Sequence, residues 1–370
     1  MVLPEGEDWM ESFKTAFGDL ADPRAGNARH DLLEVVFIAL AATLCGAQSC
    51  VDMALFARSK EAFLRNIVEM PHGPPSHDTF SRVFRRLEPG AFEAAFMAFT
   101  RTFGRKITGV VAIDGKALKG AYARGARSSP LHLVNVWAAE ARLVIAQRIA
   151  PGRNEVQGVL DAVALLDLDG CIVTADALHC RKDVAAAIRS AGGDYALSVK
   201  ANQPRLLAEA ERLLGTVPGD VAISDVEDGH DRAEVRRASI VAAPGLEALC
   251  GFPGACAVAR VEAVRQTAGG TETTGTRFFI LSACLSAERL ASVVRSHWSI
   301  ENNLHWTLDV ALGEDAARNR KGHGAQNLSL VRKLALNILK ADNEKGSLKG
   351  KIKRTGWDEA FLTKLLAHMR

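Results

Sequence analysis

The sequence predicts an α/β protein in which a mixed β-sheet is flanked by helices and follows an all-helical region. Residues 108–150 hold three β-rich segments, and the last two are close enough to form a hairpin. Two more strand-like segments, 171–176 and 194–200, alternate with helical patterns, which is typical of strands joined by helical crossovers. The first hundred residues show apolar positions at helical spacing instead.

Helix signals are clear in the N-terminal region. Asp31 and Glu34 have the spacing of a capping box, Gly46 marks a helix end, and a second helical pattern covers 51–67. A further helix has an apolar face that begins at Phe80. Its opposite face carries Arg82, Arg85 and Arg86, which are either a solvated face or a DNA contact.

The sheet pattern is interrupted at residues 202–285. A short helix at 204–214 precedes three strand-like stretches separated by Gly and Pro, and these predict a β-rich insertion. Long helices are expected again at 287–312 and 325–340 and near 358–369. Between the last two, the stretch "KGSLKGKIKR" is expected to be a flexible basic segment.

Length and composition narrow the class of protein. A chain of 370 residues favours two or three domains, and its net charge of +3 is too small to indicate a polyanion partner by itself. The seven cysteines are odd in number and form no CxxC pair, which predicts reduced thiols. The longest apolar run, 35–47, is shorter than the roughly 20 residues that a membrane span needs, and the N-terminus lacks the apolar core of a signal peptide.

Two apolar strands end in an aspartate: "VVAID" ends at Asp114 and "CIVTAD" ends at Asp176. If these strands are neighbours, their carboxylates converge at one rim of the sheet and repel each other unless a cation lies between them. Mg²⁺ suits such a place because it binds through one or two carboxylates and leaves positions for substrate phosphates. On a late helix, Glu301 lies beside the apolar stripe that begins at Ile300 and offers a third carboxylate.

Four blocks along the chain, "AIDGKALKG", "VTADALH", "YALSVKANQP" and "HWSIENNLHWTLDVALGEDAARNR", carry a family resemblance. They resemble the signature blocks of bacterial insertion-sequence transposases, specifically the H-repeat-associated, ISAs-type group. "DPRAGNARHDLLEVVFIALAATLCGA" and "PSHDTFSRVFRRLEP" resemble the N-terminal associated region of that group. The likeness runs from about Asp8 to the C-terminus.

The resemblance implies a ribonuclease-H-like catalytic domain made of 105–201 and 286–342, with the β-rich insertion 202–285 between its two parts. It also implies a helical N-terminal domain at 1–104 that is a candidate for DNA binding. Residues 343–370 remain as a basic C-terminal segment and helix.

The same resemblance implies a catalytic and metal-binding triad, Asp114, Asp176 and Glu301. Two Mg²⁺ ions, for which Mn²⁺ can substitute, would serve an in-line phosphoryl transfer that cuts DNA at element ends and joins the 3′-hydroxyl to target DNA. The implied partner is double-stranded DNA, both terminal inverted repeats and target, bound by a dimer or larger assembly. We expect no membrane association and a cytoplasmic, nucleoid-associated protein.

Basic and polar residues near the triad are candidates for DNA contact. The wider superfamily often carries Tyr, Arg and Lys around its glutamate, but Val294, His297 and Leu308 stand at those positions here. Arg295, Arg318, Arg320 and Lys321 are candidate substitutes. The remaining candidates are Lys116, Lys119, Arg124 and Arg127, expected in a glycine-containing loop after Asp114, and Lys200 and Asn202, which follow the last sheet strand.

Histidines and tryptophans near these blocks have competing interpretations. His297, Glu301 and His305 suggest zinc, but the outer pair would lie roughly 12 Å apart along a helix, too far to share one ion. His179 either assists the metal or the scissile phosphate, or serves a helix start or the core. Trp298 and Trp306 are expected in the core.

Three functions remain open from the sequence. The first is an active transposase that cuts and joins DNA. The second is a DNA-binding relic that has lost cutting, against which the intact triad argues. The third is a metal-dependent nuclease without strand transfer.

Overall fold

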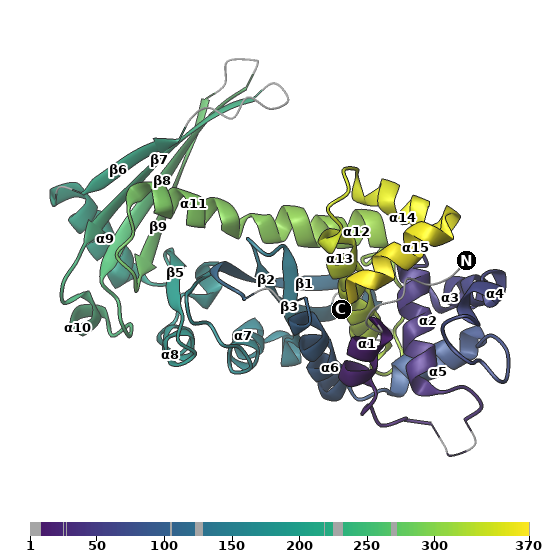
Figure 1. The fold of residues 1–370 in the computed structure, drawn as a ribbon. Helices are drawn as coiled ribbons and strands as arrows, with labels where there is room; N and C mark the ends of the chain where they lie inside the picture. Colours follow the sequence, from purple (N-terminus) through teal and green to yellow (C-terminus); the bar gives the residue numbers. More distant parts are fainter. Residues whose placement is uncertain are drawn as a thin grey trace.

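The computed structural model describes residues 9–24, 26, 28–103, 106–122, 129–217, 219–224, 232–267 and 272–369 (Figure 1). The described chain begins with six helices. They are α1 (Trp9–Phe17), α2 (Leu32–Leu44), α3 (Cys50–Ser59), α4 (Glu61–Leu64), α5 (His77–Arg86) and α6 (Pro89–Arg101). The Asp31 side chain caps α2 by accepting from the Glu34 N–H, and Gly46 ends the turn after α2 with a positive φ. Glu34 does not complete a capping box, because its carboxylate accepts from the Met70 N–H instead.

The centre of the molecule is a mixed sheet. In the described residues it has nine strands in the order β3-β2-β1-β4-β5-β9-β8-β7-β6. The first five strands are β1 (Gly109–Tyr122), β2 (Pro130–Ala138), β3 (Leu143–Ile149), β4 (Cys171–Ala175) and β5 (Asp194–Val199). Strand β1 pairs antiparallel with β2 and parallel with β4, and β4 pairs parallel with β5. The crossover helices are α7 (Glu155–Val163) and α8 (Lys182–Ser190). This is the mixed sheet with helical crossovers that the sequence predicted.

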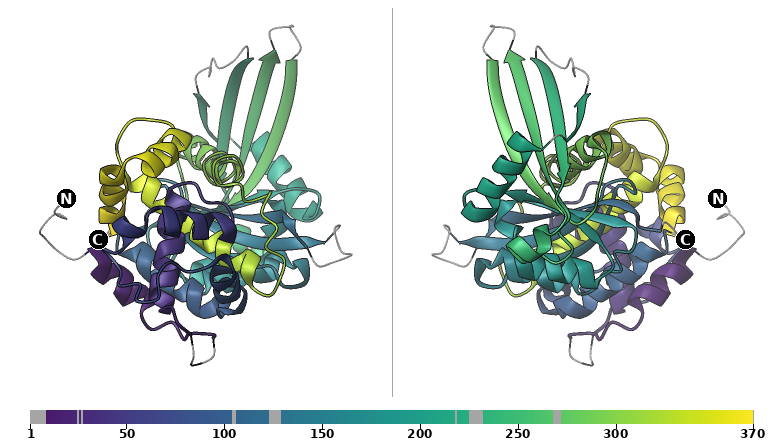
Figure 2. Two further views of the ribbon diagram at one scale, coloured as in Figure 1. Left: turned by 90° about the vertical axis from the view of Figure 1, so that its right-hand side faces the viewer. Right: turned by 90° about the vertical axis from the view of Figure 1, so that its left-hand side faces the viewer.

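The β-rich insertion extends this same sheet. Strands β6 (Asp220–Ser224), β7 (Arg232–Ala242), β8 (Ala257–Thr267) and β9 (Glu272–Leu281) are antiparallel, and β9 pairs with β5. Strand β6 and the short helix α10 (Leu246–Cys250) had no counterpart in the predicted elements. Helix α9 (Pro204–Thr216) contacts β7, β8 and β9, and α11 (Ala287–His297) contacts β6 and β7. Figure 2 shows the insertion strands projecting from the helix-covered body.

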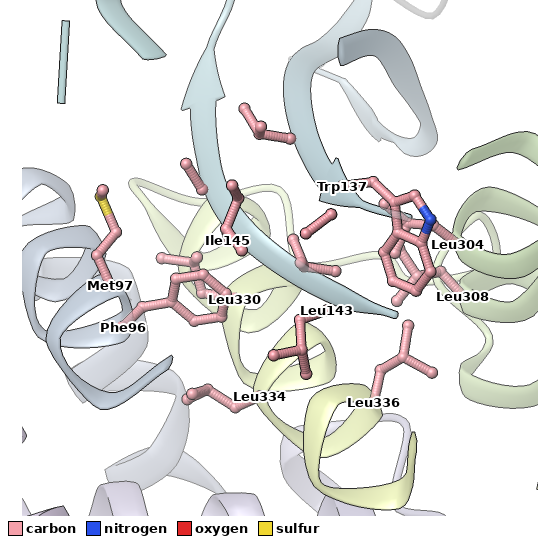
Figure 3. Close-up of a cluster of buried hydrophobic side chains, with 14 of the residues drawn as sticks. Phe96, Met97, Trp137, Leu143, Ile145, Leu304, Leu308, Leu330, Leu334 and Leu336 are labelled. Atoms are coloured by element: carbon pink, nitrogen blue, oxygen red, sulfur yellow. The ribbon is translucent and has the colours of Figure 1, made fainter. Parts of the chain in front are cut away.

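Helix α13 (Gly324–Ala341) joins the N-terminal helices to the sheet. Its side chains are buried along most of its length because it packs against α2, α5 and α6 on one side and β3 on the other. Figure 3 shows Phe96 of α6, Leu143 of β3 and Leu334 of α13 in one apolar cluster. The N-terminal helices and the sheet therefore share a core, and the expected domain boundaries stay a prediction.

The C-terminal segment is helical and ordered by ion pairs. Helices α14 (Leu348–Trp357) and α15 (Glu359–Leu366) pack on α2 and α13, and the turn η4 (Ala367–Met369) packs on α1 and α13. The expectation of a flexible segment at "KGSLKGKIKR" is therefore wrong: Ile352 is buried, and Lys351 pairs with Asp342 at 2.8 Å. Within the described residues, no helix combines the length and apolar character that crossing a membrane requires.

Candidate metal centre

Asp114 and Asp176 lie side by side at the rim of the sheet. In the parallel pair β1–β4, the last matched positions are Ile113 and Ala175, so the next residues are Asp114, which lies within β1, and Asp176, which directly follows β4. Asp114 is largely buried, and its carboxylate accepts from the Gly115 N–H. Asp176 is half exposed and caps the turn η2 (Ala177–His179) by accepting from the Leu178 N–H at 3.0 Å. Each carboxylate is therefore held by a backbone N–H of a residue that follows it closely in the chain.

Glu301 reaches the same place from a π-helical turn. The helix expected at 287–312 is interrupted: α11 is followed by the π-helix η3 (Ile300–His305) and then by α12 (Trp306–Leu312). The expected helix is therefore present, but its π-turn was not predicted, because an apolar spacing of four residues suits both helix types. Ser299 accepts a hydrogen bond from the Trp137 indole at 2.9 Å and Ile300 is buried, which anchors the turn below the exposed Glu301. Single π-turns within α-helices are frequent at functional sites.

The carboxylates of Asp114 and Glu301 repel each other. Burial and the neighbouring Glu301 carboxyl raise the pKa of Asp114 to about 8. The adjacent His305 ring lowers the pKa of Glu301 to about 2. Without a cation, the pair is therefore relieved by a proton on Asp114, and a divalent ion at this position would relieve the same repulsion more fully. The chemistry of this donor set suits a hard divalent cation.

His305 completes a cluster of three ligand-type side chains. Its Nδ1 lies 3.5 Å from Glu301 Oε2 and 3.7 Å from Asp114 Oδ2, and its ring is buried. One ligand atom from each of Asp114, Glu301 and His305 falls within 4.8 Å of the other two. The sequence analysis considered His305 only in a zinc set with His297 and Glu301, and His297 Nδ1 instead lies 3.0 Å from the Thr174 hydroxyl. The spacing of four residues between Glu301 and His305 was the sequence signal for the pair that the structure brings together.

His179 and Glu155 stand on the other side of Asp176. His179 is fully buried, its Nε2 lies 3.6 Å from Asp176 Oδ1 and 4.0 Å from Glu155 Oε2, and burial lowers its pKa. Glu155 also lies 3.0 Å from His132 Nδ1. Nothing in the sequence marked Glu155, since its approach depends on how α7 packs against β2.

Lys116 and Lys119 lie in a strand and not in a loop, because β1 continues to Tyr122. Lys116 is buried, with Nζ 2.7 Å from Asp309 and 3.6 Å from Asp315, so the expectation that it serves as an open phosphate contact is wrong. Lys119 is exposed and pairs with Asp315 at 2.7 Å. Arg124 and Arg127 lie outside the described residues.

The other predicted DNA contacts are surface residues in two places. Lys200 and Asn202 are exposed after β5, and the Asn202 amide donates to the Ala177 carbonyl beside Asp176 at 2.6 Å. Arg318, Arg320 and Lys321 are exposed in the loop before α13. In that loop, the Arg320 guanidinium donates to the Gly120 carbonyl and stacks 3.9 Å above the Tyr122 ring.

Arg295 lines a groove of about 420 Å³ between α11 and strands β7 to β9. The groove is also lined by the basic, aromatic and amide side chains of Arg236, Arg277, Trp298 and Asn302. The Arg277 guanidinium lies 4.4 Å above the Trp298 ring. Trp298 is 40% exposed and Trp306 is 62% exposed, so the expectation that both belong to the core is wrong. The groove extends to Asn302, the residue after Glu301.

Comparison with known proteins gives matches to family models, to curated sequences and to a solved structure. The model of the transposase DDE domain matches residues 105–338, and the model of the region associated with it matches residues 14–100. An H repeat-associated putative transposase, YhhI of Escherichia coli K12, is 32% identical over 91% of this chain and 93% of its own length. A transposase-named protein of Escherichia coli O157:H7, YncI, is 30% identical over 92% and 90%. A solved piggyBac transposase synaptic complex with hairpin DNA is 10% identical, with a TM-score of 0.46 over 97% of this chain and 82% of that chain.

Proposed function

The chain belongs to the transposase DDE family and is a DDE-type DNA transposase, and we propose that Asp114, Asp176 and Glu301 are the carboxylates with which it cuts and joins DNA. The observation that carries the proposal is the convergence of three acidic residues, distant in sequence, at one sheet rim. Two of them follow matched positions of adjacent parallel strands, and the third adds to the effect of burial in raising the pKa of Asp114. Such an arrangement is costly unless cations occupy it.

We propose that Asp114, Asp176 and Glu301 would together hold two divalent ions, with Asp114 shared between them, and that Mg²⁺ is the native ion with Mn²⁺ as a substitute. When bound, such ions lower the pKa of an attacking water or 3′-hydroxyl and stabilise the leaving oxygen of an in-line displacement. The backbone amides of Gly115 and Leu178 orient the two aspartates for this task. No protein nucleophile is required.

The groove beside Glu301 supports a path for the DNA backbone. Arg236, Arg277 and Arg295 bring positive charge to it, and Asn302, which lines it, is the residue after Glu301. We also propose phosphate contacts through basic side chains that are exposed on the surface: Lys119, Lys200, Arg318, Arg320 and Lys321. We expect at least a dimer on a pair of element ends, as the family likeness implies.

The test is to incubate the full chain with labelled terminal inverted repeats, target DNA and Mg²⁺ or Mn²⁺. The proposal predicts a product in which the element 3′-end is joined to target DNA. Cleavage without joining would instead identify a metal-dependent nuclease. DNA binding without cleavage would identify a relic that has lost cutting.

A further inference from the structure

His305 stands at the metal centre without an established task. Its ring is buried, and Nδ1 faces two carboxylate oxygens while Nε2 faces the Asn135 side chain. Asn135 of β2 is also the cross-strand partner of Asp114 on β1, so both lie on the same face of the sheet. The imidazole is therefore enclosed between the carboxylates and a polar residue of the neighbouring strand.

The distances at Nδ1 suit a shared ion better than hydrogen bonds. The separations of 3.5 Å and 3.7 Å exceed the usual length of an N–H···O bond, which is about 2.7–3.2 Å. Two atoms that each lie about 2.1 Å from one ion are at most about 4.2 Å apart. Both separations at Nδ1 are below that limit.

The far side of the ring has the partner that a ligating histidine needs. A metal-bound imidazole donates its other ring N–H to an acceptor, which fixes the tautomer and the ring orientation. Asn135 Oδ1 is buried and has no hydrogen-bond partner among the described residues, while Nδ2 lies 3.2 Å from His305 Nε2. The oxygen and nitrogen of the Asn135 amide have nearly the same shape, so the amide can be rotated by 180° without a change in packing. Asn135 Oδ1 then accepts a hydrogen bond from His305 Nε2–H. In this tautomer the lone pair of His305 Nδ1 points at the carboxylates.

We propose that His305 is a nitrogen ligand, through Nδ1, of the divalent ion held between Asp114 and Glu301, with Asn135 as the residue that orients its ring. This inference rests on the proposed function, because it adds a ligand to the metal centre described there. It makes the two ion positions chemically different: the ion between Asp114 and Asp176 has carboxylate oxygens, and the ion at Glu301 also has an imidazole. Imidazole is a better ligand for Mn²⁺ than for Mg²⁺, which prefers oxygen.

The experiment is pulsed electron paramagnetic resonance of Mn²⁺ bound to the full-length protein without DNA. The inference predicts the modulation of a directly coordinated ¹⁴N, and its replacement by ¹⁵N when only the histidines are labelled. His305→Asn, which places an amide oxygen near the position of Nδ1, should keep Mn²⁺ bound and lose the coupling. His297→Asn is the matched control and should keep it.

Two further variants test Asn135, the first by the same resonance measurement and the second by calorimetry of Mn²⁺ binding. Asn135→Asp should preserve the nitrogen coupling, because a carboxylate also accepts the Nε2–H. Asn135→Leu should lower Mn²⁺ affinity about tenfold to a hundredfold, as loss of an orienting partner does at other metal sites. Thermal unfolding of each variant shows whether it is folded.

The outcomes separate this inference from the proposed function. Mn²⁺ binding with DNA cleavage but without nitrogen coupling would overturn the role of His305 and leave the triad in place. If His305→Asn kept the nitrogen coupling, the role of His305 would also be overturned and the triad would stay in place. A wild-type chain that binds no Mn²⁺ at all would overturn both.

Discussion

The Lys116 ammonium lies 2.8 Å from one carboxylate oxygen of Asp309 and 2.7 Å from the other. Lys116 stands two residues after Asp114 on β1, and Asp309 lies on α12, eight residues after Glu301. This ion pair therefore connects the strand that carries one catalytic candidate to the helix that carries another. Its position beside the rim indicates a structural task for a lysine that the sequence pattern assigned to DNA.

Replacing Lys116 with Met should destabilise the protein by about 1–3 kcal/mol, because the largely buried Asp309 carboxylate would lose its main partner. Lys119→Met is the matched control, and it should cost less than about 1 kcal/mol because that side chain is exposed. Denaturant unfolding gives both values. The double variant Lys116→Met/Asp309→Leu should recover part of the loss, and equal costs at Lys116 and Lys119 would contradict this account.

The three carboxylates should be separable from DNA binding. Asp114→Asn, Asp176→Asn and Glu301→Gln should each abolish cleavage of terminal repeats and leave DNA affinity largely intact, because each keeps the size of the side chain and removes a metal ligand. Gel-shift and cleavage assays measure the two properties. Glu288→Gln, at an exposed position of α11, is the control that should cut normally. Normal cutting by any triad variant would remove that residue from the assignment.

The groove between α11 and the insertion sheet should contribute to DNA affinity through charge. Arg295→Gln should weaken DNA binding and reduce the slope of log K against log salt concentration by about one, as expected for one lost phosphate contact. Arg212→Gln is the control, because Arg212 is exposed on α9 and lies away from the groove. The buried residues of α9, Leu206 and Ala210, pack in a different apolar cluster from the buried residues of α11. Similar salt slopes for wild type and Arg295→Gln would exclude the groove from the DNA path.

Asp342, at the C-terminal end of α13, should make the free energy of unfolding depend on pH. Burial of Asp342 opposes its ionisation, but hydrogen bonds from Lys351 and Lys364 outweigh this and lower its pKa to about 2. Because this is below the value in the unfolded chain, the carboxylate stabilises the fold above about pH 4, and this contribution is lost as the pH falls towards 2. Urea unfolding at pH 7 and pH 3 should show wild type losing more stability than Asp342→Asn. Parallel losses would contradict the ion-pair assignment.

The sequence predicted that Asp114 and Asp176 come together, but only Asp176 follows the end of a strand: the expected strand end at Asp114 is wrong, because β1 continues to Tyr122. Apolar runs that end at Asp114 and Asp176 are local signals, and parallel pairing of β1 and β4 then brings the two residues together. The position of Glu301 beside a buried stripe was also legible from spacing. These features follow from periodicity, which a single sequence displays.

Other features depend on packing between distant segments and left no local signal. The π-turn at 300–305 keeps the same apolar spacing as an α-helix, so only the structure shows it. Lys116 resembled a phosphate contact because its partner, Asp309, lies far along the chain. The basic stretch at α14 appeared polar, although its apolar Ile352 packs into the core. The role proposed for His305 could not be predicted from sequence, because it depends on contacts with Asp114 and Asn135, which are distant along the chain.

The most direct measurement of the central claim is the anomalous scattering of Mn²⁺ in crystals of the full-length protein with an element end. The account predicts one ion between Asp114 and Asp176 and a second between Asp114 and Glu301. Manganese bound elsewhere, with these three carboxylates free of metal, would contradict it.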